Sequence, residues 1–133
     1  MNYYDTLIEV ADDGPATEGQ VPLARGGKQT KAVVEYELLR KHPYTYTEEE
    51  IAFEVYAVLH DIPKASRPKE RAKFLRKGHP HLRVSALAKR YGWGIHNDAE
   101  GKVALIAVES PDYERLMKDP HISRVKAFRS TRA

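Results

Sequence analysis

The chain has 133 residues, a net charge of +3 and no cysteine, and its length corresponds to about one domain. The absence of cysteine excludes disulfides, thiolate metal ligands and cysteine nucleophiles. No segment approaches the ~18 apolar residues of a membrane-spanning helix, and the N-terminus has no basic segment leading into an apolar one. We therefore expect one soluble, cytoplasmic domain that does not enter a membrane.

The first half of the sequence predicts one strand and two helices. Residues 3–10 are rich in β-branched and aromatic side chains, which is typical of a strand. After a long polar loop, apolar residues recur at helical spacing over 30–41. Thr47 and Glu50 have the spacing of a capping box, so a second helix is expected to begin there and to run to about His60.

A basic helix is predicted next. Ser66 is its candidate N-cap, Pro68 falls in the first turn, where a missing amide hydrogen costs little, and Gly78 follows the last turn. Few apolar residues remain to face a core, so we expect this helix to be mostly solvated. Its basic residues are Arg67, Lys69, Arg71, Lys73, Arg76 and Lys77.

A short helix and a hairpin follow. Ser85 is placed to cap a helix over 86–91, and the segments 92–97 and 102–108 have the composition of two strands. In the loop between them, Gly101 suits the left-handed conformation of a bulged hairpin. Both faces of the second strand are apolar, so we expect it to be central in its sheet and covered on both sides.

The C-terminal segments predict one more helix and a terminal element. Residues 110–119 are expected to form a short capped helix, and 121–133 an edge strand or an irregular helix. The predicted fold is α+β, in a single compact domain spanning 1–133. It combines a small antiparallel sheet that contains the hairpin with helices mainly on one face.

Charge is distributed unevenly along the chain. Residues 1–66 carry 12 acidic and 6 basic side chains, whereas residues 67–133 carry 7 and 16. A basic half favours association with polyanions, unless folding mixes the two halves on the surface. The leading hypothesis is a non-enzymatic module that binds nucleic acid or another phosphate-bearing partner. The predicted binding residues are Arg25, Lys28, Arg71, Lys73, Arg76, Lys77, Lys89, Arg90, Trp93 and His96.

The stretch RGGKQT resembles part of a phosphate-binding loop. The amides of Gly27 and Lys28 could approach an anion near a helix N-terminus, and Arg25 and Lys28 would add positive charge. Gln29 stands where a magnesium-binding serine or threonine would be, which argues against nucleotide hydrolysis. A plain anion site and an ordinary loop remain the two interpretations.

Two histidines separated by one residue raise the question of a metal site. If the backbone is extended, His79 and His81 point the same way, and His96 or Asp98 could complete a divalent-metal site. The close ligand spacing of structural zinc sites is absent, and His-Pro-His equally suits a solvated loop. We expect no bound metal and no cofactor.

The stretch GWGIH offers a second kind of functional surface. Gly92, Gly94 and His96 share one face of a strand, and the bare glycines admit a close neighbour. That neighbour is either a packed helix or a base, sugar or small acid. In the second case His96 would serve as the acid or base, with Asp98 or Glu100 orienting it.

The opposite face of the same strand carries Trp93 and Ile95, and we expect Trp93 to be buried.

The sequence contains no serine nucleophile elbow, no HExxH helix and no GxGxxG after a strand. The alternative hypothesis is therefore a small enzyme or small-ligand-binding protein that depends on His96. Whether the protein is an enzyme stays open at this point.

Several segments together are similar to a known family. YYDTLIEVADD, RGGKQT, EVYAV, LAKRYGWGIHNDAEGKVAL and VKAFRSTRA occur in this order along nearly the whole chain. On these segments the sequence resembles an uncharacterised bacterial family, domain-of-unknown-function family 6157. The resemblance implies no particular substrate, cofactor or catalytic residue.

Overall fold

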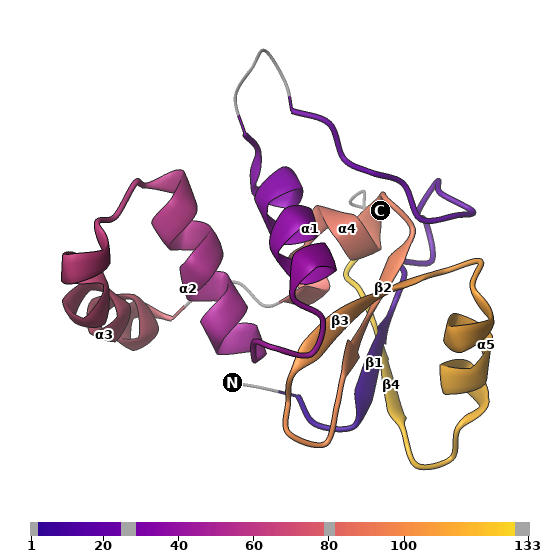
Figure 1. Cartoon of the computed structure of the whole chain (residues 1–133). Helices are drawn as coiled ribbons and strands as arrows, with labels where there is room; N and C mark the ends of the chain where they lie inside the picture. The colour runs from indigo at the N-terminus through magenta and orange to yellow at the C-terminus, as the bar shows by residue number, and fades with distance from the viewer. Residues whose placement is uncertain (1–2, 25–28, 79–81, 130–133) are drawn as a thin grey trace.

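The computed structural model describes residues 3–24, 29–78 and 82–129, and Figure 1 shows their arrangement. The α-helices are α1 (Lys31–Lys41), α2 (Glu48–Leu59), α3 (Arg67–Lys77), α4 (Ala86–Lys89) and α5 (Pro111–Lys118). Short 3-10 turns, η1 (Lys64–Ser66) and η2 (Leu82–Val84), precede α3 and α4. The strands are β1 (Thr6–Glu9), β2 (Trp93–Asn97), β3 (Val103–Ala107) and β4 (Ser123–Lys126).

The four strands form one sheet in the order β3-β2-β1-β4. The predicted hairpin is confirmed, because β2 and β3 pair antiparallel with Ile95 opposite Leu105. β1 also pairs antiparallel with β2, but β4 pairs parallel with β1. The sheet is therefore mixed rather than wholly antiparallel. The reason is that α5 connects β3 to β4, and such a helical crossover returns the chain in the same direction.

Helices cover both faces of the sheet unequally. The larger core lies between one face and helices α1, α2 and α4, and includes Ile8, Ile95 and Leu39. The other face packs Leu7 against Tyr113 and Leu116 of α5. Figure 1 shows α5 alone on its side of the sheet, with α2 and α3 extending away on the other side. The α+β class, with helices mainly on one face, is confirmed.

The expected central position of the strand after the hairpin loop is wrong. β3 is at an edge of the sheet. Its outer edge is partly covered by the segment before α2, where the amide of Tyr44 donates to Val103 O at 3.0 Å and the amide of Val103 to Tyr46 O at 2.9 Å. Both faces of β3 are apolar because Leu105 packs in the larger core and Ile106 packs on the α5 side.

Most of the predicted caps are confirmed. Thr47 and Glu50 form a reciprocal capping box, with N–O distances of 3.3 and 2.9 Å. The Ser85 hydroxyl accepts the amide of Leu87 at the start of α4. Ser66 occupies the N-cap position of α3 but makes no side-chain capping bond.

The hairpin loop and the C-terminal segment also match their predictions. Gly101 has φ of +81°, the left-handed conformation expected at this turn. The segment that followed α5 was expected as an edge strand or an irregular helix, and β4 is an edge strand.

Candidate functional site

Aromatic rings hold α3 against α2. The centroid of the Phe74 ring in α3 lies 4.9 Å from that of Tyr56 and 5.7 Å from that of Phe53, both in α2. At the start of α3, Arg67 donates from Nη1 to a carboxylate oxygen of Glu54 at 3.2 Å. No residue of α3 is buried. The helix is therefore attached along one side and leaves its opposite side in solvent.

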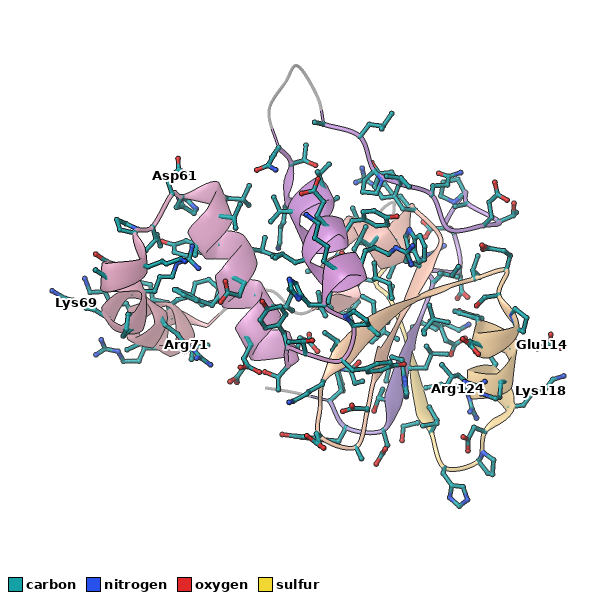
Figure 2. All side chains as sticks on the ribbon, viewed as in Figure 1. Asp61, Lys69, Arg71, Glu114, Lys118 and Arg124 are labelled. Atoms are coloured by element: carbon teal, nitrogen blue, oxygen red, sulfur yellow. The ribbon has the colours of Figure 1, made fainter. Side chains whose placement is uncertain are left out.

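Four further basic side chains of α3 are exposed, and two of them, Lys73 and Lys77, border a hollow that Tyr56 and Phe74 also line. Lys69, Lys73 and Arg76 are separated by four, three and seven residues, which places them on one face of the helix, and Lys77 follows Lys73 by four residues. Lys73 lies 3.7 Å from the Glu70 carboxylate, and an exposed pair of this kind contributes little. The other three make no ion pair with a carboxylate of the described residues. Figure 2 shows Lys69, with Arg71, at the end of the molecule remote from the sheet. The four exposed residues, which we call the α3 stripe, are Lys69, Lys73, Arg76 and Lys77.

A cavity of about 470 Å³ lies on the other side of α3, between this helix and α2. Arg71 lines it, because a spacing of two residues from Lys69 and Lys73 turns it away from the α3 stripe. The acidic residues of the lining are already engaged: Glu54 pairs with Arg67, and Glu50 accepts the amide of Thr47. Arg71 is therefore the exposed basic residue of α3 that lies on the side of this cavity.

The other basic residues predicted to bind lie elsewhere. Lys89 is the last residue of α4 and Arg90 is its C-cap. Helix α4 packs on β2 and α1, and Figure 1 shows it separated from α3 by α1 and α2. Arg25 and Lys28 fall outside the described residues. Of the predicted basic residues, the structure thus brings together Lys73, Arg76 and Lys77, while Arg71 lies on another side of the same helix.

Trp93 is part of the core. Its side chain is 8 % exposed, as predicted, and its Nε1 donates to the carbonyl oxygen of Gln20 at 2.8 Å. The Trp93 and Tyr36 ring centroids are 5.6 Å apart. A ring enclosed in this way has no free face on which a ligand could stack, so Trp93 serves the fold.

The bare face of β2 is covered by α5. A Cβ added at Gly94 would lie 2.5 Å from the Tyr113 ring. The Tyr113 hydroxyl in turn accepts the amide of Val10 at 3.1 Å, which holds the ring in place. The sequence left two neighbours open for this face, a packed helix or a bound small molecule. At Gly94 the neighbour is helix α5.

His96 contacts Tyr44, a residue of the loop between α1 and α2. Its Nδ1 lies 2.9 Å from the hydroxyl oxygen of Tyr44, and the two rings meet edge to face at 5.6 Å. Its Nε2 is buried and has no hydrogen-bond partner among the described residues. Asp98 does not orient the ring: its Oδ1 accepts the amides of Glu100 and Lys102, each at 2.9 Å, and so closes the hairpin loop.

The burial of this pair shifts both pKa values. Burial lowers the pKa of His96, although nearby carboxylates, with Asp98 the largest contributor, partly oppose it. Burial also raises the pKa of Tyr44, and the carboxylate of Asp112 adds to this shift. Both groups are therefore neutral near pH 7. A neutral imidazole could accept a proton, but the ring nitrogen of His96 that lacks a partner is buried, so a substrate would not reach it in this conformation.

Within the described part of the chain, no group of three or more metal-ligating side chains is placed to hold an ion. His79 and His81, considered as metal ligands from the sequence, lie outside the described residues. No helix of the described chain has the length and apolar character needed to cross a membrane.

Sequence reasoning missed two buried glutamates, Glu35 and Glu48, and Glu48 accepts the amide of Leu82 at 2.6 Å. Glu35 on α1 is 4 % exposed, and its carboxylate accepts the Ser85 hydroxyl at 2.8 Å. Burial raises its pKa, whereas the bond from Ser85 and the charge of Lys31 lower it. The burial of Glu35 could have been predicted from its spacing. Glu35 precedes the buried Leu39 by four residues, about one helical turn, and so lies on the same face of α1.

These features define a small α+β protein in which the lysine- and arginine-rich helix α3 packs on α2 at the end remote from the sheet. The chain belongs to the family of unknown function DUF6157, whose model matches residues 1–133, as the resemblance of its segments indicated. No curated protein matches the chain, and no solved structure matches it.

Proposed function

We propose that the protein is a non-enzymatic binding module for nucleic acid or another polyanion, and that α3 is its contact surface. The observation that carries this proposal is the α3 stripe, whose exposed cations are largely unpaired within the described residues. Cations of this kind neutralise phosphates and release their counterions on binding.

The dimensions of α3 fit a phosphate backbone. From Lys69 to Lys77 the helix rises about 12 Å, at ~1.5 Å per residue. A DNA duplex carries one charge per ~1.7 Å of its axis, so several phosphates face a surface of this length. The aromatic contacts of Phe74 keep the helix in place without using the basic side chains. A preformed surface loses less conformational freedom on binding.

The composition of α3 favours backbone contacts over base recognition. The helix contains no Asn, Gln, Ser or Thr, the residues that, with arginine, read base edges most often. Lysine acts mainly as a point charge toward phosphate. We expect weak binding, in the micromolar range or worse, with little dependence on sequence.

The His96 hypothesis receives no comparable support. Its free nitrogen is buried, and the glycine beside it is covered by Tyr113. We therefore place the proposed function on α3.

Fluorescence-anisotropy titration with short labelled DNA and RNA tests the proposal. The test variant carries glutamine at the four residues of the α3 stripe. A matched control carries glutamine at four exposed basic residues outside α3. We expect the test variant to lose binding at low salt and the control to retain most of it. Equal binding by the two variants, or no binding by the unmodified protein at low salt, would contradict the proposal. The control positions are Lys41, Lys118, Arg124 and Arg129.

A further inference from the structure

A second, smaller cavity of about 200 Å³ lies between α1, α2 and α3. Val55 and Leu82 form buried parts of its lining, and Leu59 and His60 are exposed at its rim. A cavity of about 150 Å³ is large enough for a benzene ring. The space therefore suits a small molecule with an apolar body of about one ring.

A buried carboxyl group is the main polar feature of this cavity. Glu35 lines it, is 4 % exposed and accepts the Ser85 hydroxyl at 2.8 Å. Within the described residues Glu35 forms no ion pair. The other charged or titratable groups in the lining are Lys31, Tyr56 and His60. Burying a carboxylate without a contacting cation costs folding free energy. A ligand whose cation contacts Glu35 would offset this cost, which favours its binding.

Aromatic rings form one wall of the same cavity. The Tyr56 ring centroid lies 4.9 Å from that of Phe74 and 4.3 Å from that of His60. Aromatic rings stabilise both apolar groups and ammonium ions placed against them. An aromatic wall next to a carboxylate suits an organic ammonium ion, because the carboxylate pairs with the charge and the rings contact the apolar body.

We propose that this cavity binds a small organic amine, with its ammonium group on the Glu35 carboxylate and its apolar body against Tyr56 and Phe74. An organic anion would fit less well, because it would approach a carboxyl group that has no neutralising partner in contact. The lining of this site includes no residue of the α3 stripe, although Tyr56 and Phe74 also border the hollow that Lys73 and Lys77 line. The amine site and the polyanion surface can therefore be tested separately.

Titration with benzylamine near pH 7, followed by amide chemical shifts, tests the inference. Benzyl alcohol, similar in shape but neutral, is the matched probe. Glu35→Gln removes the charge while Gln can still accept the Ser85 hydroxyl, and Glu37→Gln removes an exposed charge from the same helix. Ala52→Phe fills the cavity without changing charge.

We expect saturable benzylamine binding to the unmodified protein and to Glu37→Gln, with shifts centred on Val55 and Leu82. Glu35→Gln should weaken it by at least about tenfold, since a hydrogen bond to a charged group is lost. Ala52→Phe, checked for its fold by circular dichroism, should block it. Equal affinity for benzyl alcohol, unchanged binding by Glu35→Gln or by folded Ala52→Phe, or no saturable binding to the unmodified protein would each overturn the inference.

Discussion

The hydroxyl oxygen of Tyr44 lies 2.9 Å from Nδ1 of His96 and ties the loop between α1 and α2 to the second strand of the sheet. Tyr44 reaches this position with φ of +54°, a left-handed conformation that is unfavourable for a bulky residue. Its amide also donates to the carbonyl of Val103 at 3.0 Å. Backbone and side-chain contacts together thus hold a conformation that Tyr44 would seldom adopt by itself.

His96 should make the stability of the protein depend on pH. Burial lowers the pKa of His96 in the folded state, so below its unfolded value of about 6.5 the unfolded chain binds more protons. The stabilising contribution is therefore complete above about pH 6.5 and is lost as pH falls through the lower folded pKa. Urea unfolding across this range should show a decline for the unmodified protein that His96→Gln reduces. The exposed His121, changed to Gln, should leave the decline unchanged.

Glu35 should act in the opposite direction. Burial raises its pKa above the usual 4.5. Above about pH 4.5 the folded chain therefore binds more protons at this residue than the unfolded chain does. The stability due to the neutral carboxyl is present below about pH 4.5 and is lost as pH rises through the raised pKa. Glu35→Gln should therefore raise the free energy of unfolding at neutral pH, measured by urea unfolding. Glu37→Gln is the control, and an equal gain in both variants would contradict the prediction.

Trp93 should be a major contributor to stability. Its ring packs against Tyr36 and lies close to Gly19, and its Nε1 is bonded to Gln20. Trp93→Ala should lower the free energy of unfolding by roughly 3 to 5 kcal/mol, since it leaves a large cavity in the core. Urea unfolding measures this loss. A Trp emission maximum typical of full water exposure in the folded protein would show that the ring is not buried.

The Tyr113 ring should leave no room for a side chain at position 94. Gly94→Ala places a Cβ where the Tyr113 ring now lies, and overpacking of this kind costs about 1 to 3 kcal/mol. In a Tyr113→Ala background the same change should cost much less, because the ring is gone. A double-mutant cycle by urea unfolding measures the coupling. Additive effects of the two changes would mean that α5 is not the neighbour that Gly94 accommodates.

Local signals in the sequence were sufficient for the helix starts and the hairpin. The capping box of Thr47, the cap at Ser85 and the left-handed Gly101 each depend on a few neighbouring residues, and the structure confirms all three. The burial of Trp93 followed from alternation within one strand. Such features are encoded by short-range sterics and hydrogen bonding.

Long-range pairings were not predictable in the same way. The parallel alignment of β4 with β1 and the edge position of β3 depend on where the chain returns after α5. The contact between Tyr44 and His96 joins residues 52 positions apart. No local pattern carries this information. The candidate site was found in part, since the basic character of α3 was evident but the separation of Lys89 and Arg90 from it was not.

Binding to nucleic acid through the α3 stripe should depend steeply on salt. Each phosphate contacted on a duplex contributes about 0.9 to the slope of log K against log salt, so four contacts give a slope near ~3.6. Arg76→Gln should lower this slope by about one phosphate equivalent, because one cation of the stripe is removed. Lys118→Gln on α5 removes a cation already paired with Glu114 at 3.0 Å and should leave the slope unchanged. Anisotropy titrations over a series of salt concentrations measure both slopes, and an unaltered slope for Arg76→Gln would place the contact surface on another element.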